Sequence, residues 1–261
     1  MDVMTIRRPA DNRRHLDREP GFRSRGNFEE GGRASSVAIG VFDGVHLGHR
    51  QVLDGCDTAL TFEPHPLHAL APDRAPHLLS DWKTKLRKLE AAGVRRVAVI
   101  RFDTGWSNVA AEDFISHVLI DQLNASSVSV GENFRFGSGG AGTAATLAQC
   151  PSLQVRAVPL LQHGASGRPV SSSRIRQLVS EGDVEQAAEL LGAPLALYGL
   201  VVRGNRLAFD PQLAVPAPGE YLGCVQGQLV TIRTGGVGLV RVAGPTLRTV
   251  ATEVEFIRRI R

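Results

Sequence analysis

One short segment constrains the fold of this chain more than any other. The apolar run Val37–Ile39 is followed at once by Gly-Val-Phe-Asp-Gly-Val-His-Leu-Gly-His, which fills positions 40–49. A buried strand that stops at glycine and then opens a helix presents backbone N–H groups and the positive end of a helix dipole at one point. Strand–turn–helix units of this kind bind phosphate, and His46 and His49 add two side-chain donors. The segment therefore predicts an α/β fold with a nucleotide at the turn.

Three further segments look like parts of the same site. They matter because a pair of histidines near a helix start is more often plain polar surface. They read Thr-Phe-Glu-Pro-His-Pro at 61–66, Gly-Glu-Asn-Phe-Arg-Phe-Gly at 131–137 and Val-Ser-Ser-Ser-Arg-Ile-Arg at 170–176. Each lies at the end of an apolar run or at the start of a helical stretch, so the four segments together favour one shared nucleotide site.

Strand-like and helix-like stretches alternate over the first three quarters of the chain. Short apolar runs predict strands at 37–39, 59–62, 97–102, 128–130 and 153–159. Helices are expected from an N-cap at Ser80 to Gly93, over 110–123 and over 174–191. This alternation predicts a parallel sheet covered by helices, with the ligand beyond the carboxyl ends of the strands.

The pattern changes after Leu195. Short β-like pieces follow at 196–202, 221–225, 229–233 and 237–242, and the last piece, 252–261, fits either a strand or a helix. The first 35 residues are charged, rich in Arg and Gly, and without periodicity. We therefore divide the chain into a flexible N-terminal tail (1–35), a nucleotide-binding domain (36–194) and a small β domain (195–261).

Composition excludes several classes of protein. The chain has 261 residues, of which 43% are hydrophobic and 21% charged, as in soluble globular proteins. Its apolar runs stay well below the roughly 18 residues of a membrane span. The N-terminal arginines are not followed by the apolar segment of a secretory signal. We expect a cytoplasmic protein that does not bind a membrane.

Cysteine spacing and charge exclude further partners. Cys56, Cys150 and Cys224 are widely separated, which fits neither a zinc site nor a disulfide framework. The net charge is only +4, and the arginines are spread along the chain rather than gathered into a stripe with aromatics. We therefore expect an anionic small substrate and no nucleic acid. The sequence does not indicate an oligomeric state.

The four segments together resemble those of the bacterial bifunctional FAD synthetases, in which an FMN adenylyltransferase domain precedes a riboflavin kinase domain. The resemblance covers residues 37–202 strongly and the remainder weakly. It implies a Rossmann-like parallel sheet of the HxGH nucleotidyltransferase type followed by a small β domain, here a reduced barrel. It also implies that the FMN phosphate attacks the α-phosphorus of ATP, which gives FAD and pyrophosphate. Mg²⁺ is expected on the ATP triphosphate, with no metal site formed by the protein.

The resemblance assigns roles to individual residues. It makes His46, His49, Ser172 and Arg176 catalytic, as groups that grip the phosphates of ATP. The other residues it places at ATP are Gly40, Phe42, Asp43, Gly44, Ser171 and Ser173. The residues it places at the flavin are Phe62, Pro64, His65, Pro66, Asn133, Phe134, Arg135 and Phe136. For the flavin residues the alternatives are a proline-rich turn and a strand-to-loop turn without a ligand, and Arg174 is read as a solvated helix residue.

The chain departs from the family pattern after the histidines. Only residues 50–57 separate His49 from Thr58, the apparent start of the second predicted strand, whereas the family has a longer helix there. The whole connection, residues 42–57, still exceeds the roughly twelve residues that a parallel crossover needs. We therefore expect an intact sheet with a short first helix behind the histidines.

A second departure lies in the C-terminal domain. The kinase motif of the family, Gly-x-Pro-Thr-Ala-Asn, is replaced by Ala-Phe-Asp-Pro-Gln-Leu at 208–213, so the Thr and Asn that hold metal and phosphate are missing. The sequence therefore predicts adenylyl transfer to FMN without riboflavin kinase activity. Two alternatives stay open: a nucleotidyltransferase that acts on another phosphorylated substrate, and a non-catalytic flavin nucleotide-binding protein.

Overall fold

The structure, a computed structural model, describes residues 1–9, 34–164, 167–202, 204–235, 239–244 and 247–261. Its contacts divide the chain into two compact units, each built from three pieces. The first unit is Met1–Val41, His49–Ala75 and Leu89–Leu160, and the second is Phe42–Gly48, Pro76–Lys88 and Leu161–Arg261. The division falls inside helix α1 (Leu47–Leu53) and helix α3 (Trp82–Ala91). Each unit is described by itself.

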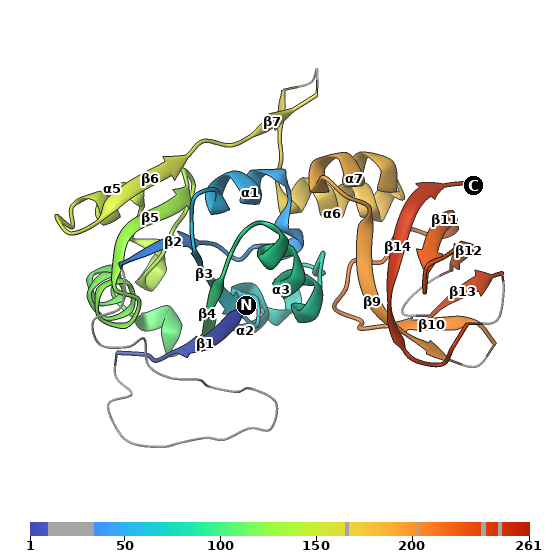
Figure 1. Cartoon of the computed structure of the whole chain (residues 1–261), viewed down its shortest axis with the longest axis horizontal. Helices are drawn as coiled ribbons and strands as arrows, with labels where there is room; N and C mark the ends of the chain where they lie inside the picture. Colours follow the sequence, from blue (N-terminus) through green and yellow to red (C-terminus); the bar gives the residue numbers. More distant parts are fainter. Residues whose placement is uncertain (10–33, 165–166, 203, 236–238, 245–246) are drawn as a thin grey trace. The chain divides into compact units, whose positions relative to one another are not determined.

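A six-stranded parallel sheet forms the first unit, in the order β1-β4-β3-β2-β5-β6 (Figure 1). The strands are β1 Asp2–Ile6, β2 Ser35–Ile39, β3 Thr58–Glu63, β4 Arg96–Arg101, β5 Ala125–Gly131 and β6 Gln154–Val158. The central strands β2, β3 and β4 are buried almost throughout, as expected for parallel strands covered on both faces. The predicted Rossmann-like sheet is confirmed.

Strand β1 corrects the prediction of a flexible tail. Asp2–Ile6 pairs in parallel with β4, in a register that places Ile6 opposite Ile100, and Ile6 is 2% exposed. The segment Asp-Val-Met-Thr-Ile carries the β-branched residues of a strand, but the arginines that follow obscured this signal. Residues 10–33 of the predicted tail lie outside the described residues.

The helices of the first unit are short. They are α2 Pro66–Leu70, α4 Ala111–Asp113 and α5 Ala144–Ala148, with the single turns η2 Pro72–Arg74, η3 Trp106–Asn108 and η5 Ser138–Gly140 and the π-helix η4 Phe114–Gln122. The apolar stripe predicted over 110–123 is buried as expected, but most of this helix is π rather than α. The Leu123 N–H donates to the Val118 carbonyl at 3.1 Å, an i→i+5 bond of the kind that defines a π-helix.

The second unit contains a closed six-stranded barrel in the order β10-β13-β12-β11-β14-β9 (Figure 1). Its strands are β9 Leu195–Val202, β10 Arg206–Phe209, β11 Gly219–Val225, β12 Gln228–Thr234, β13 Leu239–Ala243 and β14 Ala251–Arg259. Burial alternates along β11 and β12, as expected for strands that line a small core. The ambiguous C-terminal piece is thus a strand, β10 was not predicted, and residues 237–238 of one predicted strand lie outside the described residues.

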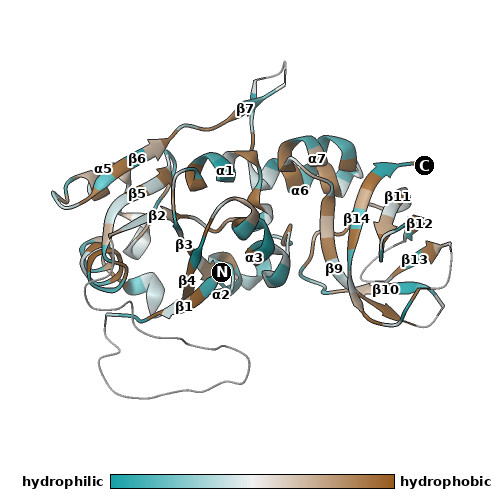
Figure 2. Cartoon of the chain, in the orientation of Figure 1, coloured by the Kyte–Doolittle hydropathy of each residue, from teal (hydrophilic) through white to brown (hydrophobic). Residues whose placement is uncertain are grey.

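Two helices and a short hairpin complete the second unit. The hairpin pairs β7 Gln162–His163 with β8 Arg168–Pro169, and the single turn η1 is Asp43–Val45. The helix predicted over 174–191 is broken into α6 Ser172–Glu181 and α7 Val184–Leu191. Gly182 ends α6 with φ 80°, and Asp183 begins α7 by accepting a hydrogen bond from the Gln186 N–H at 3.0 Å. The ribbon of α7 alternates between hydrophobic and hydrophilic colours in Figure 2, which fits a helix with one buried face.

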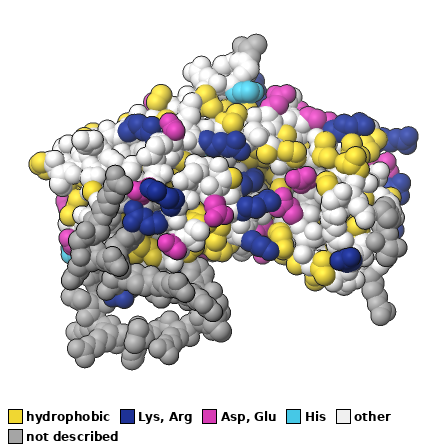
Figure 3. Space-filling model, in the orientation of Figure 1, with side chains coloured by type: hydrophobic (Ala, Val, Ile, Leu, Met, Phe, Trp, Pro, Cys, Tyr) yellow, Lys and Arg dark blue, Asp and Glu magenta, His cyan; other side chains and the backbone are white. Residues whose placement is uncertain are grey.

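The two compact units do not divide at residue 195, the predicted domain boundary. The second unit includes α6 and α7 with the barrel, and their apolar residues share one core with the barrel interior. On the face drawn in Figure 3, basic and acidic side chains are interspersed. Among the residues that the structure describes, no helix is long and apolar enough to cross a membrane.

Candidate functional site

The turn of residues 42–46 has an unusual backbone. Phe42, Gly44 and Val45 all have positive φ, at 53°, 79° and 46°. Such a conformation costs a non-glycine residue about 1–3 kcal/mol, and it persists only where the surroundings enforce it. Here Phe42 and Val45 are 0% and 1% exposed. A Cβ on Gly44 would lie 3.1 Å from the Cβ of Leu79, a tight contact, so glycine suits this position for space as well as for φ.

The buried carboxylate of Asp43 holds this turn in place. It is 2% exposed and accepts hydrogen bonds from the Leu79 N–H (2.9 Å to Oδ1), the Ser80 N–H (3.2 Å) and Nη2 of Arg176 (2.7 Å). The Gly44 N–H donates in turn to Oγ of Ser80 at 3.2 Å. A buried carboxylate is stable only when it is paired and hydrogen-bonded in this way. The turn is therefore anchored to residues more than thirty positions away.

Helix α6 supplies the cation and a hydroxyl. Nε of Arg176 donates to the His77 carbonyl at 2.7 Å, while its Nη2 binds Asp43. Oγ of Ser172 donates to the Asp43 carbonyl at 3.1 Å. Ser171 is the N-cap of α6, because its Oγ accepts from the Arg174 N–H at 3.2 Å. We call Asp43, Leu79, Ser80, Ser172 and Arg176 the Asp43 cluster.

His46 is a buried, neutral imidazole. It is 5% exposed, and its pKa is lowered to about 4, mainly because burial penalises the charged form and further because Arg176 is positive. A hydrogen bond with its own backbone raises the pKa and offsets part of this shift. A Cβ on Gly48 would lie 3.3 Å from the ring, so glycine leaves room for the imidazole. At neutral pH His46 therefore acts as a hydrogen-bonding group and not as a cation.

The helix after the histidines is short, as predicted. Helix α1 has seven residues, with His49 in its first turn. Nη2 of Arg156, from β6, donates to the carbonyls of Gln51 and Val52 at 3.2 Å each and also contacts the Asp54 carbonyl. Arg156 thereby satisfies the carbonyls at the C-terminal end of α1, which is favourable for a cation at this end of a helix.

The predicted flavin residues of the 61–66 segment have structural contacts in the first unit. Phe62 is 9% exposed and packs edge-to-face on Phe102, with ring centroids 5.8 Å apart. Nδ1 of His65 accepts from the Leu67 N–H at 3.1 Å and so caps α2, which begins at Pro66. Pro64 is exposed.

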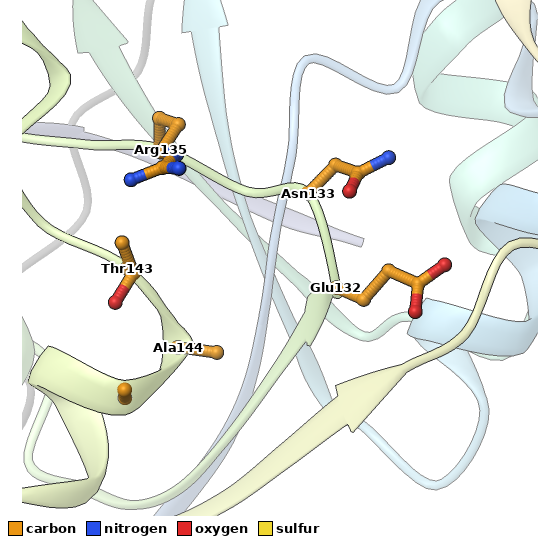
Figure 4. A pocket seen from close by; sticks show the side chains of 6 residues that line it. Glu132, Asn133, Arg135, Thr143 and Ala144 are labelled. Carbon is orange, nitrogen blue, oxygen red and sulfur yellow. The ribbon is translucent and has the colours of Figure 1, made fainter.

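The 133–136 segment borders an open cavity of about 390 Å³ (Figure 4). The cavity is lined by Glu132, Asn133, Arg135, Thr143, Ala144 and Ala145. Figure 4 shows Arg135 above Thr143, whereas Glu132 and Asn133 extend away from them. Phe134 and Phe136 instead stack on each other, with centroids 5.6 Å apart. Two of the four predicted residues therefore line the cavity, and the two phenylalanines pack beside it.

The second unit brings together most of the residues predicted at ATP. They are Phe42, Asp43, Gly44, His46, Ser171, Ser172, Ser173 and Arg176. Gly40 and His49 belong to the first unit, where the Gly40 N–H donates to the Leu60 carbonyl at 3.1 Å. Sequence reasoning missed the 77–80 segment. It read Ser80 as the N-cap of α3, but the Thr84 N–H donates to Asp81 at 2.9 Å and Ser80 serves the turn instead.

Comparison with known proteins identifies relatives of this chain. A family model described as FAD synthetase matches residues 29–174. The bifunctional riboflavin kinase/FMN adenylyltransferase of Escherichia coli (strain K12) is 35% identical over 184 residues, which cover 66% of this chain and 58% of that protein. The protein of the same name from Bacillus subtilis (strain 168) is 31% identical over 183 residues, with the same two coverages of 66% and 58%.

The matched region therefore spans 58% of the length of these two curated relatives. One solved structure covers more of the chain. A macrolide-efflux protein from Streptococcus pneumoniae has a TM-score of 0.75 and 26% identity, and the match covers 87% of this chain and 86% of that one.

Proposed function

This chain belongs to the FAD synthetase family, and from that premise we propose that it transfers the adenylyl group of ATP to FMN, giving FAD and pyrophosphate. The observation that carries the proposal is the Asp43 cluster. It ties the strained 42–46 turn to α6 twice, because the buried Asp43 carboxylate accepts from Arg176 and the Asp43 backbone carbonyl accepts from Ser172, and so it fixes the positions of His46, Ser172 and Arg176. Phosphoryl chemistry depends mainly on such positioning and on stabilisation of charge.

In the proposed reaction a phosphate oxygen of FMN attacks the α-phosphorus of ATP, and the bond from that phosphorus to the pyrophosphate oxygen breaks. No covalent intermediate with the protein is required. The neutral ring of His46 would donate a hydrogen bond to a phosphate oxygen, and the hydroxyl of Ser172 and the charge of Arg176 would stabilise the leaving pyrophosphate. Asp43 would position other residues and would not contact the substrates, because its carboxylate oxygens already accept hydrogen bonds from Leu79, Ser80 and Arg176.

Mg²⁺ would enter with ATP, on the triphosphate oxygens, and neutralise part of their charge. The turn does not suit a protein-bound metal ion, because the carboxylate of Asp43 already accepts hydrogen bonds from three groups. Among the residues that the structure describes, no group of three or more His, Cys, Asp or Glu is placed to hold a metal.

We propose that the cavity beside Asn133 and Arg135, in the first unit, binds FMN. Its volume of about 390 Å³ is within the range of small-molecule sites. Its lining carries one cation, Arg135, that could bind an FMN phosphate, and one carboxylate, Glu132, whose Oε1 already accepts from the Leu160 N–H. We expect Arg135→Ala to raise the KM for FMN at least fivefold with little change in the KM for ATP. Equal changes in both would contradict this assignment.

We also propose that the barrel does not phosphorylate riboflavin. The residues after β10 are Asp-Pro-Gln-Leu, which lack the Thr and Asn of the kinase motif. Riboflavin and Mg-ATP are expected to give no FMN with the purified protein, and measurable FMN formation would overturn this.

The test of the main proposal is direct. The protein is incubated with FMN and Mg-ATP, and FAD and pyrophosphate are followed together. We expect His46→Ala and Arg176→Ala to lose about a hundredfold or more in turnover. Arg174→Ala is the matched control, since Arg174 lies on the same helix and, in the contacts described, its guanidinium binds Gln177 and no member of the Asp43 cluster; turnover is expected within twofold of the parent.

Two other outcomes would redirect the assignment. Tight binding of FMN or FAD without turnover would identify a flavin nucleotide-binding protein. Pyrophosphate release with a different phosphorylated acceptor, and none with FMN, would identify another nucleotidyltransferase.

A further inference from the structure

A segment that follows β10 has no role in the proposed reaction, yet it makes specific backbone contacts. Residues 212–214, here called the strap, lie beside Leu78, and Leu213 and Leu78 form a parallel bridge. The Leu78 N–H donates to the Gln212 carbonyl at 2.6 Å, and the Ala214 N–H donates to the Leu78 carbonyl at 2.8 Å. Asp210 shapes the start of the strap, because its Oδ1 accepts from the Gln212 N–H at 2.8 Å.

The neighbours of Leu78 are the residues that hold the 42–46 turn. Successive residues of an extended chain direct their backbone groups to opposite sides. Leu78 faces the strap, while the Leu79 N–H donates to Asp43 and the His77 carbonyl accepts from Arg176. The 77–80 segment therefore has the strap on one side and the Asp43 cluster on the other, and all of these residues belong to the second unit.

Burial ties the two sides together. Leu213 and Ala214 are 4% and 7% exposed, and Leu79 is fully buried in the same apolar core. A close-packed core transmits a shift of one member to its neighbours. A displacement of about 1 Å at catalytic groups lowers rates by up to about a hundredfold. A change in the strap is thus expected to reach Asp43 through the backbone of residues 78–80.

We propose that the strap is a positioning element for adenylyl transfer: residues 212–214 of the barrel fix the 77–80 segment, which in turn sets the Asp43 carboxylate and Arg176. The inference rests on the proposed function. In this proposal the barrel domain contributes to adenylyl transfer, because its strap positions residues of the Asp43 cluster, and it does not catalyse a kinase reaction of its own.

Substitutions in the strap test this inference. Leu213→Ala removes its buried side chain, Ala214→Pro removes the N–H that donates to Leu78, and Leu213→Met preserves volume. Ile232→Ala is the matched control, because Ile232 is fully buried in the same core but lies on β12, which pairs with β11 and β13 and not with the strap. The steady-state rate of FAD formation is measured with ATP and FMN varied in turn, at a temperature where all variants are folded. Hydrogen exchange of the Leu79 and Ser80 amides is measured in parallel.

We expect Leu213→Ala and Ile232→Ala to lower the melting temperature by similar amounts. Only Leu213→Ala and Ala214→Pro are expected to lower kcat at least tenfold and to speed exchange of the Leu79 and Ser80 amides at least tenfold, and Leu213→Met is expected to restore both. Equal loss of kcat and of amide protection in Ile232→Ala would overturn the proposal, since general destabilisation would then suffice.

The exchange measurement separates this inference from the proposed function. If the parent protein forms no FAD but the strap variants still lose protection at Leu79 and Ser80, the mechanical link stands and the adenylyl-transfer assignment fails. If the parent forms FAD and the strap variants keep both kcat and protection, the strap is not a positioning element.

Discussion

Acidification tests the environment of His46 quantitatively. The imidazole has a pKa of about 4 in the folded protein, against 6.5 for an unperturbed histidine. Between these two values the unfolded chain binds a proton that the folded chain does not, so the free energy of unfolding falls as the pH falls. The loss amounts to about 1.4 kcal/mol per pH unit and to roughly 3 kcal/mol over the whole interval. Above pH 6.5 His46 is neutral in both states and adds no pH dependence.

The assay is urea unfolding of the parent protein, His46→Gln and His117→Gln at about pH 7.5, 6 and 5. Comparison of variants cancels the other titrating groups, which all three proteins share. We expect the stability difference between the parent and His46→Gln to change by about 2 kcal/mol between pH 7.5 and pH 5, in the direction that favours the variant in acid. His117→Gln, at a side chain that is 47% exposed, is the control for the loss of a surface histidine.

Parallel pH profiles for the parent and His46→Gln would refute the reasoning. They would mean that the ring is solvated or already paired with an anion, and the view of His46 as a neutral donor to phosphate would fall with it. A profile of the opposite sign, in which the parent gains stability in acid, would require a carboxylate beside the ring in place of Arg176.

Three further predictions concern the turn of residues 42–46 and helix α1. Gly44→Ala is expected to cost about 1–3 kcal/mol more in urea unfolding than Gly55→Ala, because both have positive φ but only Gly44 has side chains within 4 Å; equal costs would contradict the packing argument. Asp43→Asn is expected to cost about 3–5 kcal/mol, since it leaves Arg176 without its buried partner, and a neutral result in the same assay would show that the ion pair is not required. Arg156→Ala is expected to cost about 1–2 kcal/mol and to increase hydrogen exchange at the end of α1, and unchanged exchange there would contradict its capping role.

The sheet and the motifs at its strand ends could be predicted because they are local. Val37–Ile39 and the residues of β3 and β4 are apolar runs of strand length, and the histidine segment carries its own turn and helix signals. The serines at 171–173 are likewise a local signal, because serine is a common N-cap, and they predicted the start of α6. A local signal needs no knowledge of its partner, so sequence reasoning recovers it.

The contacts of Asp43 could not be predicted, because they join segments that only the fold brings together. Ser80 is an example. A serine before a helical stretch is an ordinary N-cap, but here Asp81 accepts from the Thr84 N–H, and Oγ of Ser80 accepts from the Gly44 N–H of the turn. The Gly182-Asp183 pair is a local signal for a helix end followed by a helix start. The helical spacing of apolar residues continues across this pair, however, and so favoured one long helix. The pairing of β1 with β4 spans more than ninety positions and has no local trace.

The threading of the chain through the two units bears on how the molecule folds. Residues 42–48 belong to the second unit, whereas the residues on either side of them, Val41 and His49, belong to the first. Their partners on α6 lie some 130 positions further along, and closing a flexible loop of that length is opposed by chain entropy. Formation of the first unit fixes both ends of this seven-residue excursion and so removes much of its freedom beforehand. Folding of the two units is therefore expected to be cooperative, and neither unit corresponds to a continuous piece of polypeptide that could be excised with one cut.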